Sequence, residues 1–194
     1  MMNDIELITL VNNSGMSVDV CNLGARITSI KLNIDDTPTE LTVGYDNAED
    51  YYHDSYYLGA TCGRVCNRIG NAKFQLNGKH YQLTKNDGDN CLHGGIKNFS
   101  HTLWEVDKRS LTENKITFTL TSEDGDQGFP GNLRVQVNVE LTEDNQLIIQ
   151  YHGTSDAPTP VNLTNHTYFN LGENTCEALL LTLDSSHYLQ HYNY

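Results

Sequence analysis

Basic residues are scarce in this chain of 194 residues. Lys and Arg total 12 against 25 for Asp and Glu, so the formal net charge is −13. This balance repels a nucleic-acid backbone and an anionic membrane surface, and neither is an expected partner. It also disfavours a phosphorylated substrate, although a local Arg can outweigh the overall field. The expected partner is therefore neutral or small.

Long apolar runs and a regular set of cysteines are also missing. The first residues are acidic, and no stretch reaches the length of a signal-peptide core or a membrane span. The cysteines number 5, an odd count, in a chain large enough to form a core without crosslinks. We therefore expect reduced thiols, no disulfide framework and a cytoplasmic location.

Helical periodicity is absent as well, and the sequence shows neither repeats nor low-complexity tracts. Alternating runs predict strands instead, and Asn77-Gly78 between two such runs is a strong hairpin signal. A polar connection over 35–54, rich in Tyr and Asp, is expected to be an ordered loop. The predicted strands are 6–11, 17–20, 25–32, 102–107, 115–122, 133–141 and 146–153. Burying their apolar faces predicts an all-β, antiparallel sandwich in a single domain over residues 1–194.

Three segments hold polar residues that a strand core would not select. They are GRVCNR (63–68), NCLHGG (90–95) and VNLTNHTYFNL (161–171). The third segment is the most informative, because an unsatisfied buried amide or imidazole costs roughly 1–3 kcal/mol.

Each candidate residue in these segments also has a simple structural interpretation. His166 fits a hydrogen-bonded core histidine, and His93 fits a loop histidine beside a flexible turn. Arg68 fits a surface ion pair, and Asn67 fits a cap or a turn. The residues taken one by one leave both interpretations open.

Taken together and in order, the three segments resemble the aldose 1-epimerase (galactose mutarotase) family, which carries GR-x-x-NRI, LHGG and NLTNH-x-YFNL segments. The resemblance extends to GARITSIKL, GYDNAEDYY, NGKHYQL and the block EDGDQGFPGNLRVQVNVELTEDNQLIIQY. It implies a galactose mutarotase-like antiparallel β-supersandwich. It also implies an isomerase of carbohydrate metabolism that interconverts the α and β anomers of free galactose or glucose.

The same resemblance implies roles for individual residues. The family's sugar-binding Asn-Arg pair falls on Asn67 and Arg68, and its active-site histidine on His93. Its general acid falls on His166, and Tyr168 lies in the same sugar-contacting segment. His166 and His93 are thus the expected catalytic residues, and all five are expected to contact the sugar. Asn67, Arg68, His93 and His166 are expected to converge on one concave surface.

Mutarotation matches this chemistry. A proton leaves the C1 hydroxyl, another reaches the ring oxygen, and the ring opens, rotates about C1–C2 and recloses. Histidine suits such a proton transfer, since its ordinary pKa is roughly 6.5. No metal or redox cofactor is expected.

One part of the family pattern is missing. Family members extend past residue 194, and their catalytic base is a glutamate in that later segment, so the resemblance covers the N-terminal part and no base is assigned here. A fragment, a truncated product and a non-catalytic carbohydrate-binding pseudo-enzyme all stay open. An incomplete sandwich would leave strand edges and an apolar face uncovered, so either self-association through these edges or low stability is expected. A metal site at His187 and His191, spaced i and i+4, is a minor alternative because no helix is predicted there.

Overall fold

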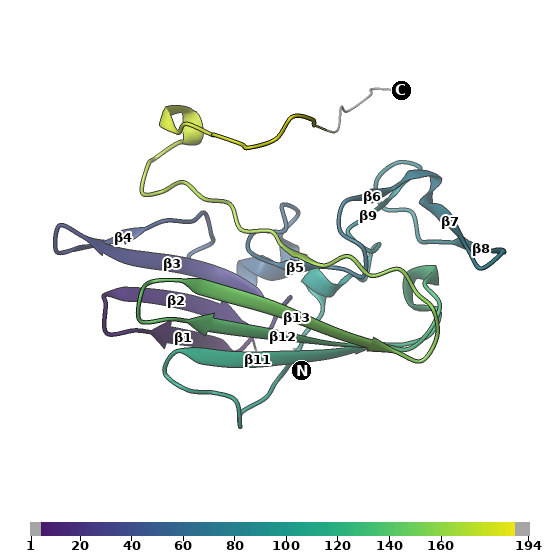
Figure 1. Cartoon of the computed structure of the whole chain (residues 1–194), viewed down its shortest axis with the longest axis horizontal. Coiled ribbons are helices and arrows are strands. Elements are labelled where there is room, and N and C mark those ends of the chain that lie inside the picture. Colours follow the sequence, from purple (N-terminus) through teal and green to yellow (C-terminus); the bar gives the residue numbers. More distant parts are fainter. Residues whose placement is uncertain (1–4, 189–194) are drawn as a thin grey trace.

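Two four-stranded sheets pack face to face in the computed structural model, which describes residues 5–188 (Figure 1). One sheet has the order β1-β2-β3-β4 and the other β10-β11-β12-β13. All pairings between the named strands of this part of the chain are antiparallel, which confirms the predicted all-β fold. The strands of the first sheet are β1 (Leu7–Val11), β2 (Met16–Cys21), β3 (Arg26–Ile34) and β4 (Thr37–Glu40), and those of the second are β10 (Glu105–Val106), β11 (Lys115–Ser122), β12 (Leu133–Leu141) and β13 (Leu147–Ser155).

Three short two-stranded sheets complete the fold, and two of them lie together at one end of the sandwich (Figure 1). They pair β5 (Thr61–Cys62) with β14 (Thr164–Asn165), β6 (Arg68–Ile69) with β9 (Cys91–Leu92), and β7 (Lys73–Leu76) with β8 (Lys79–Gln82). Helical structure in the described residues is confined to 3-10 turns, namely η1 (Ala48–His53), η2 (Gly70–Ala72), η3 (Phe99–His101), η4 (Asp126–Gly128) and η5 (Cys176–Ala178).

The core lies between the two main sheets. Strand β12 shows why it forms, since every second side chain points inward and is at most 2% exposed. Across from it, strands β2 and β3 contribute Val18, Val20 and Ile27 to the same hydrophobic cluster, and Phe99 and Trp104 join it from the connection. Burying each such aliphatic side chain stabilises the fold by about 1.5–3 kcal/mol.

The hairpin predicted around Asn77-Gly78 is confirmed. Strands β7 and β8 pair from Lys73↔Gln82 to Leu76↔Lys79, which leaves two residues in the turn. Asn77 and Gly78 have φ of +50° and +78°, the left-handed values that a two-residue hairpin turn requires.

Two expectations about strands need correction. The strand expected over 102–107 is reduced to β10, because the backbone of Thr102 and Trp104 bonds to the β2–β3 connection instead of to β11. The loop expected over 35–54 is ordered, but part of it forms β4. This strand was missed because it is polar and contains Pro38, which an edge strand tolerates.

Candidate functional site

The five residues predicted to contact a ligand line one pocket of about 500 Å³. Asn67 and Arg68 lie at the start of β6, His93 follows β9, and His166 and Tyr168 follow β14. The structure therefore brings together three segments that are far apart in the sequence. The remaining lining residues are Ser55, Tyr56, Tyr57, Cys66, Leu92 and Thr164.

Short strand pairings bring these segments to the same place. Strand β6 pairs with β9 at Arg68↔Leu92, and the His93 N–H continues this contact by donating to the Asn67 carbonyl at 3.1 Å. Strand β14 pairs with β5, and the His166 N–H donates to the carbonyl of Ala60 at 2.9 Å. Both histidines are thus fixed through their own backbones.

Gly94 allows the His93 segment to approach the segment that begins at Gly63. Its φ is +94°, and a Cβ built there would lie 2.0 Å from the Gly63 carbonyl oxygen. Only glycine accommodates both the left-handed backbone and the contact. The first glycine of the LHGG segment is therefore required for steric reasons.

The two imidazoles form the centre of the site. The ring centroids of His93 and His166 are 5.2 Å apart with the planes at 90°, and His166 is 5.2 Å from Tyr168. Burial, together with His166 and Arg68, lowers the pKa of His93 from 6.5 to about 4. Because the Asn67 N–H donates to its Nδ1 at 3.0 Å, the neutral ring carries its proton on Nε2. His93 is therefore a neutral hydrogen-bond donor at pH 7.

Asn67 and Arg68 make the structural contacts considered for them and also line the pocket. Arg68 Nε forms an ion pair with Asp87 at 2.7 Å, the surface contact considered as the alternative. Asn67 has φ of +61°, and its side-chain oxygen accepts the Arg68 N–H at 2.9 Å, as in a turn. These contacts orient the two side chains without removing them from the pocket. The ion pair engages one of the five N–H donors of the guanidinium.

Other polar residues of the three segments have structural roles. The Asn165 amide donates to the Gly59 carbonyl at 2.8 Å and accepts from the Thr167 N–H at 3.0 Å. Arg64 is 2% exposed, and its guanidinium donates to five oxygens of Ser122, Glu123, Pro130 and Thr159. Burial lowers the pKa of Arg64.

Sequence reasoning missed the contribution of the Tyr-rich loop to the pocket. Tyr57 has ring centroids 4.6 Å from His93 and 6.0 Å from His166, and Ser55 and Tyr56 lie beside it in the lining. The only signal in the sequence was the density of Tyr and Asp in DSYY, which was interpreted as packing over a sheet.

Neither a metal cluster nor a membrane-spanning helix is found among residues 5–188. No three His, Cys, Asp or Glu side chains of these residues gather closely enough to hold a metal ion. His187 is exposed, and its proposed partner His191 lies outside the described residues. No helix in the same range is long and apolar enough to cross a bilayer.

An antiparallel β-sandwich with a polar pocket built around two histidines defines the class, a galactose mutarotase-like β-sandwich protein. The particular family follows from sequence comparison. The aldose 1-epimerase family profile matches residues 6–193, and the chain belongs to that family.

Named relatives agree with this assignment. An aldose 1-epimerase from Haemophilus influenzae is 46% identical over 166 residues, which are 86% of this chain and 48% of the relative. Human galactose mutarotase is 37% identical over 157 residues, 80% of this chain and 45% of that protein. A crystal structure of galactose 1-epimerase from Lactobacillus acidophilus is 35% identical with a TM-score of 0.79, over 88% of this chain and 50% of that one. The chain thus spans about half the length of the relatives that it matches.

Proposed function

We propose that the pocket binds a free aldohexose such as galactose or glucose, and that the protein interconverts the α and β anomers of that sugar. The observation that carries the proposal is the convergence of His93 and His166, 5.2 Å apart, with Asn67 and Arg68 in one pocket. Family membership supports the reaction class.

Each residue has a role in the proposal that agrees with its surroundings. His166 gives a proton to the ring oxygen as the C1 hydroxyl loses one to a water molecule, and on reclosure His166 takes a proton back from the ring hydroxyl while the C1 oxygen regains one from water. His93, neutral and protonated on Nε2, donates a hydrogen bond that positions the sugar. Arg68, Asn67 and Tyr168 contact hydroxyl groups. No cofactor takes part in this scheme.

A neutral sugar suits the charge of the pocket better than a sugar phosphate. Arg68 is the one permanently cationic side chain among the described lining residues, and it is paired with Asp87. His93 is held uncharged by its surroundings. Little net positive charge is therefore available to a phosphate group.

One observation favours a second candidate, a carbohydrate-binding protein without catalysis. The described residues that line the pocket include no carboxylate to remove the proton from C1. Glu173 and Glu177, which follow His166 in the sequence, are exposed and do not line it. In both candidates the sugar occupies the same pocket.

Polarimetry on freshly dissolved α-D-galactose, combined with titration calorimetry, separates the two candidates. In the catalytic case, His166→Ala slows anomer exchange by about 10²- to 10⁴-fold. A His152→Ala control, at an exposed histidine of β13, keeps the original rate. Binding without any faster exchange favours the second candidate, and absence of binding refutes both.

We also propose that residues 1–194 belong to one β-sandwich domain and that the protein acts in the cytoplasm. One hydrophobic cluster contains side chains from both main sheets, which supports a single domain. All five cysteines are free, and free thiols suit a reducing compartment. Self-association through the edge strands β1, β4, β10 and β13 stays a prediction, to be measured by analytical ultracentrifugation.

A further inference from the structure

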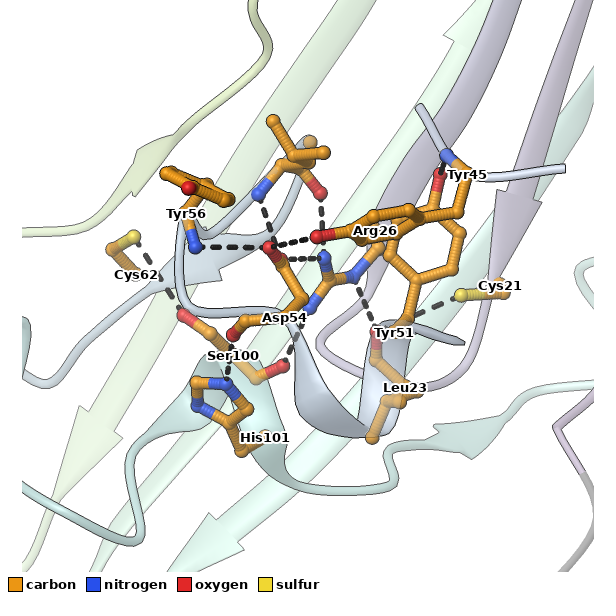
Figure 2. Close-up of polar contacts among 12 residues, drawn as sticks. Cys21, Leu23, Arg26, Tyr45, Tyr51, Asp54, Tyr56, Cys62, Ser100 and His101 are labelled. Carbon is orange, nitrogen blue, oxygen red and sulfur yellow. Dashed lines mark hydrogen bonds and ion pairs between the residues drawn. The ribbon is translucent and has the colours of Figure 1, made fainter. Parts of the chain in front are cut away.

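A buried ion pair next to the pocket joins two segments to which the proposed function assigns no role. Figure 2 shows Arg26 of β3 facing Asp54, which follows η1, and both side chains are 0% exposed. The guanidinium also donates to the carbonyl oxygens of Leu23, Leu58 and Ser100 and lies 4.5 Å from the centre of the Tyr51 ring. A buried pair by itself is weak evidence for stability, so the question is what it holds in place.

This pair holds the backbone on both sides of Tyr57. The Asp54 carboxylate accepts the N–H of Tyr56 at 2.9 Å and that of Leu58 at 2.8 Å, and Arg26 donates to the Leu58 carbonyl at 2.7 Å. Between these bonds, Tyr57 has φ of +59°, a left-handed value that a bulky side chain rarely adopts. Such strain persists only where the surroundings enforce it.

Held in this way, the Tyr57 ring packs among three histidines. Its centroid is 4.6 Å from that of His93, 5.5 Å from that of His101 and 6.0 Å from that of His166. His101 also contacts the main-chain carbonyl oxygen of Asp54 at 2.8 Å, so the backbone of Asp54 is tied to a second ring of this arrangement. Against this ring, His93 is only 9% exposed although it lines the pocket.

The groups that surround His93 are Tyr57, His166, Arg68 and the Asn67 N–H. Arg68 is cationic, and none of the four groups is a carboxylate. Burial is the largest cause of the lowered pKa of His93, ahead of His166 and Arg68. The Tyr57 ring, tilted at 59° with its centroid 4.6 Å away, is one of the groups that cover the imidazole.

We propose that Tyr57 is a positioning residue which, fixed by the Arg26–Asp54 pair, shields His93 from water and holds it as a neutral donor through Nε2. The proposal rests on the proposed function in one respect only, namely that the acceptor of this hydrogen bond is a sugar oxygen. The state of the imidazole can be measured without sugar.

The test compares Tyr57→Gly with Tyr57→Phe by NMR of the ¹⁵N-labelled histidine rings. Glycine removes the ring and suits the left-handed backbone, whereas phenylalanine keeps the ring and removes the hydroxyl. In Tyr57→Gly the pKa of His93 rises from about 4 toward 6.5, while the neutral ring keeps its proton on Nε2 because the Asn67 N–H still donates to Nδ1. Tyr57→Phe keeps the original pKa of His93, and so does Tyr188→Ala, a change of an exposed tyrosine outside the pocket.

Far-ultraviolet circular dichroism establishes whether each variant is folded. If Tyr57→Gly is unfolded, Tyr57→Asn takes its place, because Asn also tolerates a positive φ. A folded ring-deleted variant in which His93 keeps its original pKa overturns the proposal. So does a Tyr57→Phe variant that changes His93 as much as the ring deletion does. Galactose binding, measured on the same samples, tests the proposed function separately, since a protein that binds no sugar still reports the state of His93.

Discussion

Acidification should weaken this fold through His93 in a defined pH range. Its pKa is about 4 in the folded chain and 6.5 as the ordinary value of the unfolded chain. Between these values the unfolded state binds more protons, so the free energy of unfolding falls as the pH falls. The contribution is fully present above pH 6.5 and is lost progressively on the way down to pH 4.

The magnitude follows from the two pKa values. Each tenfold change in protonation corresponds to about 1.4 kcal/mol, so lowering the pH from 7.5 to 5 removes about 2 kcal/mol through His93. At pH 4 the loss reaches about 3 kcal/mol. Such amounts are a large share of the roughly 5–15 kcal/mol that stabilises a typical domain.

His93→Asn isolates this effect. The Asn side-chain oxygen can accept the Asn67 N–H in place of Nδ1, and Asn tolerates the φ of +51° at this position. Urea unfolding at pH 7.5 and pH 5 should show that the original protein loses about 2 kcal/mol more than the variant. His80→Asn, at an exposed histidine of β8, should keep the original pH dependence. Equal pH dependence in the His93→Asn variant and the original protein would refute the reasoning.

Three further changes test the packing around the site. Asp54→Asn leaves the Arg26 charge buried without its partner and should lower the free energy of unfolding by about 3–5 kcal/mol in urea titrations. Gly94→Ala should both destabilise the chain and weaken galactose binding in calorimetry, because its Cβ would meet the Gly63 carbonyl at 2.0 Å. Phe118→Ala empties a fully buried position of β11 and should cost about 3–5 kcal/mol in the same titrations.

Each of these changes has its own control. Gly70→Ala introduces a Cβ with nothing within 4 Å and should leave sugar binding unchanged, so an equal loss in both glycine variants would contradict the steric argument. Asp36→Asn removes an exposed carboxylate, and stability losses of similar size at Asp36 and Asp54 would contradict the role of the buried pair. A Phe118→Ala variant as stable as the original would contradict the assignment of the core.

Local signals in the sequence were enough to predict the hairpin and the strands in which apolar and polar residues alternate. The strand over 115–122 and that over 133–141 match β11 and β12 to the residue, because one buried face enforces a period of two. Asn77-Gly78 marked its turn because few residue pairs adopt two positive φ values. Strand β4 and the shortened β10 escaped prediction, since edge pairing and long-range backbone bonds leave no periodic pattern.

For the pocket, the sequence by itself determined which polar residues were candidates, and ordered motifs identified the family. Only the tertiary structure decided that Asn67, Arg68, His93, His166 and Tyr168 share one pocket, because β6 pairs with β9 and β14 with β5 across long sequence separations. It also decided the charge of His93, which depends on burial and on neighbours from other segments. The place of Tyr57 depends on a buried ion pair between residues 28 positions apart, which no local pattern encodes.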